Sequence, residues 1–155
     1  MSPRPSGFPA SASGQQGLSR ALIGFCGVWM VGLGAYFILV RPALLPEDVR
    51  YIGFNPDDIE RQLPGLKAWL GHVFTVMGGF MAGAGVLVLQ LVRRGVWDGP
   101  GMTWTLATAG ALTIVLMSAI NFSIHSDFRW LLLVPAILWA LALALTLTGD
   151  GRDRT

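Results

Sequence analysis

The sequence has little charge and almost no cysteine. Asp, Glu, Lys and Arg make up only 13% of its 155 residues, about half of the share that is usual in a soluble domain. Hydrophobic residues make up 53%, and the mean hydropathy is +0.57. We therefore expect a membrane protein. The single cysteine, Cys26, excludes an intramolecular disulfide bond and a CxxC redox motif.

Several functional classes lack their usual signals. The net charge is only +2 and no basic run is interleaved with aromatic residues, so nucleic acid is not an expected partner. The sequence has no Gly-x-Ser-x-Gly motif, no phosphate-binding loop, no dinucleotide fingerprint and no zinc-protease motif. These absences favour a protein without catalytic activity, and we predict neither a metal nor a cofactor.

Four long segments contain no Asp, Glu, Lys or Arg. About 20 apolar residues cross a bilayer as a helix, because lipid offers no hydrogen-bond partner to bare backbone. The lack of an ionisable group at depth disfavours a proton-coupled carrier or pump. We predict an all-α integral membrane four-helix bundle over residues 18–148, with spans at 21–40, 68–92, 101–122 and 130–148.

The chain ends and the basic residues set the expected topology. Residues 1–17 are rich in Pro, Ser and Gly and are predicted to be a disordered tail, and residues 149–155 a polar tail. The first span is too long for the apolar part of a signal peptide, so we expect it to remain uncleaved. Four spans place both termini on one side, and the pair Arg93 and Arg94 favours the cytoplasmic side of a bacterial inner membrane.

The segment 41–67 between the first two spans is unusually long and polar. Pro46 suits a first helical turn, and Gly53 can end it. Asn55 is a favourable N-cap, followed by Pro56 and by acids that complement a helix dipole. We predict two short helices that form a cap on the outer, extracytoplasmic side.

Small and polar residues share one face of the second span. His72, Thr75, Gly79, Gly83, Val86 and Gln90 follow helical spacing. Small residues four apart let two membrane helices approach closely, so we predict that this face packs against another helix, within the chain or in a second copy. The predicted packing positions are Gly24, Gly27, Gly34, Thr75, Gly79, Gly83 and Gly110.

Polar side chains are expected to gather at the outer end of the bundle. Several interpretations remain open for this cluster. A zinc site or a bis-histidine haem would need ligand spacing and matched depth that the histidines do not show. A quinone or lipid head group could be hydrogen-bonded under an apolar roof, or the residues could simply join and cap helices. The candidate residues are Arg41, His72, Asn121, His125 and Asp127.

The glycine-bearing first span, the outer segment "RPALLP" and the glycine-rich run "VMGGFMAGAGVL" resemble small DoxX-like bacterial membrane proteins. The resemblance covers most of residues 18–148 and concerns the architecture. It implies an association with quinone-linked redox work or with oxidative-stress complexes.

Three functions follow in order of preference. The first is a non-catalytic module that stabilises or recruits a membrane complex, through a membrane-protein partner or a second copy. The second is a binder of a quinone or another lipophilic ligand at the outer polar cluster. The third is a small transporter or channel.

Overall fold

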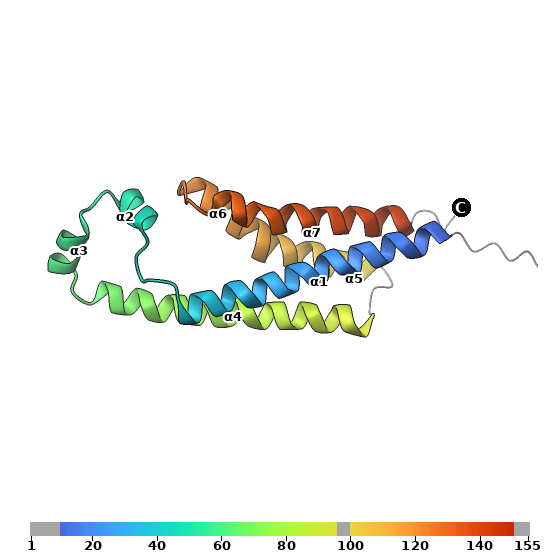
Figure 1. Cartoon of the computed structure of the whole chain (residues 1–155), viewed down its shortest axis with the longest axis horizontal. Coiled ribbons are helices and arrows are strands. Elements are labelled where there is room, and N and C mark those ends of the chain that lie inside the picture. Colours follow the sequence, from blue (N-terminus) through green and yellow to red (C-terminus); the bar gives the residue numbers. More distant parts are fainter. Residues whose placement is uncertain (1–9, 96–99, 151–155) are drawn as a thin grey trace, which may run out of the picture.

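The apolar segments form long helices in a computed structural model that describes residues 10–95 and 100–150 (Figure 1). No strand occurs among these residues, and the predicted all-α fold is confirmed. The elements are α1 (Ala10–Leu39), α2 (Pro46–Ile52), α3 (Pro56–Gln62), α4 (Leu66–Arg94), α5 (Pro100–Gly110), the π-helical segment η1 (Ala111–Val115), α6 (Leu116–Ser123) and α7 (Arg129–Asp150).

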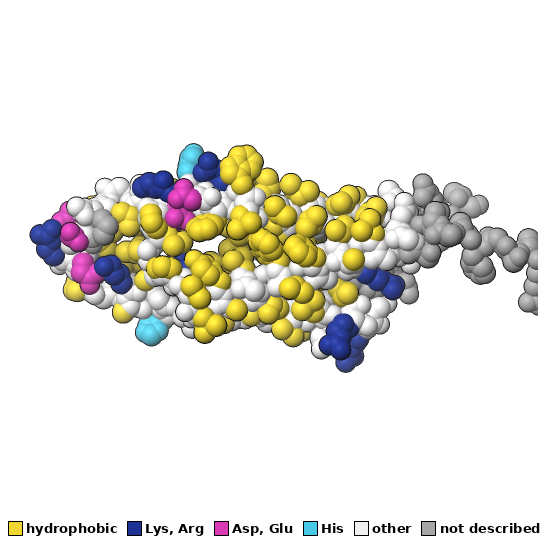
Figure 2. Space-filling model, in the orientation of Figure 1, with side chains coloured by type: hydrophobic (Ala, Val, Ile, Leu, Met, Phe, Trp, Pro, Cys, Tyr) yellow, Lys and Arg dark blue, Asp and Glu magenta, His cyan; other side chains and the backbone are white. Residues whose placement is uncertain are grey.

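Four helical stretches are long and apolar enough to cross a membrane, which fits a multi-pass membrane protein. Hydrophobic side chains cover the middle of the molecule, while Lys and Arg lie towards its two ends (Figure 2). The third stretch consists of α5, η1 and α6 in sequence, so it is a single span with a π-helical centre.

Both terminal helices are longer than expected. The helix α1 begins at Ala10, so residues 10–17 are helical although the sequence predicts a disordered tail there. Likewise α7 continues to Asp150, inside the predicted polar tail. Extending an existing helix adds one hydrogen bond per residue without a new nucleation cost. Residues 1–9 and 151–155 lie outside the described part.

Glycines allow α1 and α4 to pack closely. A Cβ atom on Gly78 would lie 2.6 Å from the carbonyl oxygen of Gly34, and one on Gly85 would lie 2.7 Å from that of Gly27. Only a residue without a side chain fits at such positions, and van der Waals contact between the two backbones then holds the helices together. Gly24 lies farther along the same contact, facing Val92.

The face predicted for this packing points elsewhere. A Cβ atom on Gly79 or Gly83 would have no atom of another part of the described chain within 4 Å, and Thr75 is exposed. The α1 contact instead uses the adjacent row that contains Gly78 and Gly85. Two glycine rows lie side by side on α4, and spacing alone does not tell which one faces α1.

The second close contact joins α7 to residues 19–26 of α1, near the middle of that helix. Ser19 Oγ donates a hydrogen bond to the carbonyl oxygen of Ala142 at 2.9 Å, and the Cys26 thiol lies 3.5 Å from that of Pro135. Trp139 of α7 packs over Gly110 of α5, where a side chain in place of the glycine would collide with the indole ring. From here α1 and α7 diverge towards α2, which leaves the bundle open at the cap end (Figure 1).

The predicted helical cap is present. Asn55 Oδ1 accepts a hydrogen bond from the Asp57 amide at 3.3 Å and so begins α3. Gly53 ends α2 with φ of 76°, a left-handed conformation that glycine adopts without strain. Ile59 of α3 is buried at 5% exposure, and α3 contacts α4.

Candidate functional site

A cavity of about 820 Å³ lies between the α1–α4 pair and the wall formed by η1, α6 and the start of α7. Figure 2 shows the hollow on this face, close to the charged cap end. Protein interiors are normally packed with few voids larger than a water molecule, and binding pockets for small molecules fall in the range of about 300–1,000 Å³. The divergence of α1 from α7 therefore produces a space of ligand size.

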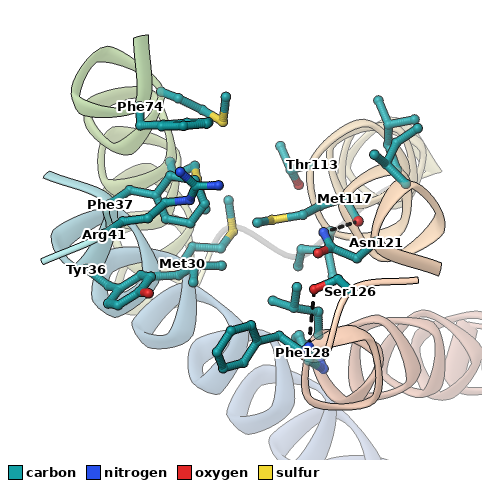
Figure 3. A pocket seen from close by; sticks show the side chains of 18 of the residues that line it. Met30, Tyr36, Phe37, Arg41, Phe74, Thr113, Met117, Asn121, Ser126 and Phe128 are labelled. Carbon is teal, nitrogen blue, oxygen red and sulfur yellow. Dashed lines mark hydrogen bonds between the residues drawn. The ribbon is translucent and has the colours of Figure 1, made fainter. Parts of the chain in front are cut away.

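The cavity walls are almost entirely apolar. The α1–α4 side contributes aromatic rings and methionines, including Phe37 and Met30, and the opposite wall contributes Met117 and Phe128 (Figure 3). Methionine side chains are flexible and polarizable, so they adapt to ligands of different shape.

The π-helical segment forms part of the far wall. Leu112, Thr113 and Ile114 line the cavity, and the Thr113 hydroxyl donates to the carbonyl oxygen of Ala109 at 2.6 Å. A π-helical turn is uncommon and often marks a functional position in a helix. Its location at the cavity strengthens the assignment of a binding site here.

Arg41 stands at the cap end of the cavity, and its side chain is only 7% exposed. Its Nη2 atom lies 3.1 Å from Asp48 Oδ2, and Nη1 donates to the carbonyl oxygen of Pro42 at 2.8 Å. The guanidinium carbon is 3.5 Å from the centroid of the Phe74 ring and 5.2 Å from that of Phe37. The ion pair and the ring faces together offset the cost of withdrawing this charge from water.

The cap also places a carboxylate at the cavity. Glu47 of α2 lines the space and is 4% exposed. Its Oε1 atom accepts a hydrogen bond from the Ser126 hydroxyl at 3.2 Å, and Ser126 Oγ in turn accepts from the Phe128 amide at 3.2 Å. This chain of hydrogen bonds joins α2 to the turn between α6 and α7.

Asn121 reaches the same end from the opposite wall. Its Nδ2 atom donates to the carbonyl oxygen of Met117 at 2.9 Å, and the side chain lines the cavity across from Arg41 (Figure 3). Two of the five predicted ligand residues, Arg41 and Asn121, are thus brought to one cavity by helices far apart in the sequence.

The other three predicted ligand residues do not line this space. His72 is exposed on α4, and His125 is exposed in the turn after α6 with φ of 54°. Asp127 pairs with Arg50 at 2.7 Å on the surface. Its hydrogen bond and its charge raise the pKa of the Arg50 guanidinium above the ordinary value. This pair connects α2 to the α6–α7 turn.

A metal centre has no support in the described part of the chain, where no three His, Cys, Asp or Glu side chains are grouped to hold an ion. Of the five predicted site residues only Arg41 and Asn121 line the cavity, where Glu47 and Ser126 join them. His72 is absent from it because its face of α4 is turned away from the bundle.

Sequence reasoning missed the contributions of Glu47, Ser126 and Trp29. The sequence accounts for Glu47 as a first-turn acid of the cap, which it also is. Trp29 lies in the middle of α1 and lines the cavity, and its buried Nε1 atom has no hydrogen-bond partner among the described residues. A tryptophan at mid-span, away from the membrane interfaces where the residue is enriched, is the signal that could have indicated it.

Comparison of the chain with protein-family models, with curated proteins and with solved structures gives no match. The geometry of the cavity is accordingly the basis for assigning a function.

Proposed function

We propose that this multi-pass membrane protein binds a lipophilic small molecule in the cavity between α1–α4 and α6–α7, beneath the cap. The observation that carries the proposal is the cavity itself, about 820 Å³ of apolar space with polar groups at one end. A lipophilic molecule in this space would gain van der Waals contacts with the apolar side chains that line it.

The distribution of polarity describes the ligand. The apolar part would lie along Met30, Phe37 and Met117, and the polar part would reach Asn121 and the cap. A molecule of this kind partitions into the bilayer, so it would be supplied by the membrane. A quinone belongs to this class, and the resemblance to DoxX-like proteins adds to its candidacy.

A cavity-filling variant tests the proposal. In Met117→Trp the larger side chain occupies the space, and we expect the ligand recovered by solvent extraction and mass spectrometry to fall at least about tenfold. Val115→Trp is the matched control, because Val115 is 46% exposed and lies outside the cavity lining on the same span. An equal amount of co-purified molecule in both variants would remove the support for a site here.

A second candidate is the non-catalytic module that recruits a membrane partner. The observation that favours it is the outward face of α4, where Gly79 and Gly83 meet no other part of the described chain and Gln90 is exposed. An exposed polar amide on a membrane helix gains from a hydrogen bond to a neighbouring helix. Gly83→Leu would then abolish a stoichiometric complex seen by native mass spectrometry in mild detergent, whereas a complex that persists in Gly83→Leu would argue against this face.

A further inference from the structure

The charged residues that line the cavity all come from the cap segment 41–67, and none comes from the apolar spans. Three charged side chains line it, namely one cation, Arg41, and two carboxylates, Glu47 and Asp48. Arg41 and Asp48 neutralise each other in an ion pair of 3.1 Å. Glu47 remains as the carboxylate at the cavity whose hydrogen bond comes from a neutral hydroxyl, that of Ser126.

The other charged groups of the region are engaged on the surface. Arg50 pairs with Asp127 where both side chains are more than half exposed, and its charge also interacts with that of Glu47 without a salt bridge between the two. Arg129 donates to two carbonyl oxygens, those of His125 and Ser126, and is not part of the lining. Exposed charges such as these are screened by water and salt, whereas Glu47 faces a space of low dielectric, where its charge is felt more strongly.

From these contacts we propose that the ligand is a lipophilic organic cation, such as a quaternary ammonium or phosphonium compound, held between Glu47 and the aromatic walls. The inference rests on the proposed function and names the chemical class of its ligand. Glu47 forms no salt bridge with another described residue. A buried carboxylate without a salt bridge is costly, and a bound cation reduces this cost.

The aromatic rings support the same ligand class. The faces of aromatic rings attract cations, and cages of such rings recognise quaternary ammonium groups. The chain itself provides an example, since Phe74 and Phe37 already hold the guanidinium of Arg41. Tyr36 and Phe128 also line the cavity from opposite sides (Figure 3) and remain available to a ligand.

An anionic head group fits less well. The two terminal nitrogens of Arg41 are bonded to Asp48 and to the carbonyl oxygen of Pro42, and the guanidinium lies over the ring of Phe74. Asp48 already neutralises the charge of Arg41, and an anion at the remaining N–H groups of the guanidinium would lie near two carboxylates, those of Glu47 and Asp48. Like charges at short range in a low dielectric repel strongly.

Two probes of nearly equal shape and opposite charge test this inference. Tetraphenylphosphonium is a cation and tetraphenylborate an anion, and their binding to the purified protein in uncharged detergent can be measured by equilibrium dialysis against protein-free micelles. We expect the wild type to bind the cation, and Glu47→Gln to weaken this binding at least about tenfold. Glu60→Gln is the matched control, because Glu60 is half exposed and pairs with Lys67 outside the cavity; cation binding should be unchanged in it.

Uncharged triphenylphosphine oxide separates failure of this inference from failure of the proposed function. If Glu47→Gln still binds the neutral compound, the variant is folded and its loss of the cation reflects charge, which supports the inference. Equal cation binding in Glu47→Gln and wild type would overturn the inference, as would a preference for tetraphenylborate. Binding of the neutral compound alone would overturn it but leave the proposed function intact, whereas binding of none of the three probes, together with an empty solvent extract, would overturn both.

Discussion

The guanidinium carbon of Arg41 lies 3.5 Å from the centroid of the Phe74 ring, while its Nη2 atom is 3.1 Å from a carboxylate oxygen of Asp48. One side chain thus joins the end of the first span, the second span and the cap. Because the same three elements surround the cap end of the cavity, the position of the cap over the cavity depends on this arginine.

Removal of the side chain tests this role. In Arg41→Ala, Asp48 loses its cation in a mostly buried place, and we expect a loss of about 2–3 kcal/mol in the free energy of unfolding, less than for a fully buried pair. Hydrogen exchange of the α2 amides should accelerate more than that of α4. Arg61→Ala is the control, since its pair with Asp58 is exposed and is worth less than about 1 kcal/mol. Equal exchange in both variants would contradict the role of Arg41.

Two neighbouring glycines of α4 should respond differently to the same substitution. In Gly78→Ala the new Cβ atom would lie 2.6 Å from the Gly34 carbonyl oxygen, so we expect overpacking to cost about 1–3 kcal/mol. In Gly79→Ala no atom lies within 4 Å, and the better helix propensity of alanine should leave stability unchanged or raise it by up to about 1 kcal/mol. Thermal unfolding in detergent measures both, and the reverse order would refute the observed register of α1 on α4.

These two glycines also show how far the sequence predicts the fold. Apolar length predicts the four spans, and turn chemistry at Asn55 and Gly53 predicts the two short helices of the cap, because both signals are local. The rotation of α4 about its axis cannot be predicted from local signals, because Gly78 and Gly79 offer smooth surfaces on adjacent sides of the helix. Which surface contacts α1 depends on how the side chains of both helices pack together, and the sequence of one helix alone does not determine that packing.

The site illustrates the same limit. Arg41 and Asn121 can be predicted as site residues because polar side chains at the ends of spans are few. Glu47 cannot, because its place in the cavity depends on how α2 folds back towards the turn that holds Ser126. The imidazole of His72 has the chemistry of a ligand-binding group, but the rotation of α4 leaves this side chain exposed.

The ion pair between Arg50 and Asp127 should hold α2 of the cap against the turn between α6 and α7. Both side chains are more than half exposed, so Asp127→Asn should change global stability by less than about 1 kcal/mol. The variant should nonetheless raise hydrogen exchange of α2, and added salt should raise it in the wild type by weakening the same pair. Asp57→Asn serves as the control, because Asp57 forms no ion pair with the described residues of α7 or its preceding turn. If salt accelerates hydrogen exchange of α2 equally in Asp127→Asn and wild type, the ion pair between Arg50 and Asp127 does not restrain α2.

Trp139 and Trp29 should respond differently to replacement by phenylalanine. Trp139 Nε1 donates to the carbonyl oxygen of Leu106 at 3.0 Å, so Trp139→Phe removes a satisfied hydrogen bond and should cost at least about 1 kcal/mol. Trp29 Nε1 is buried without a partner in the part of the chain that the structure describes, so Trp29→Phe in ligand-free protein should cost less than Trp139→Phe. If an acceptor atom of a neutral ligand such as a quinone occupies that position, Trp29→Phe will instead weaken ligand binding, by about 0.5–1.5 kcal/mol for a neutral hydrogen bond. Thermal unfolding with and without bound ligand measures both effects, and a larger loss for Trp29→Phe than for Trp139→Phe in ligand-free protein would show that the indole of Trp29 already has a partner.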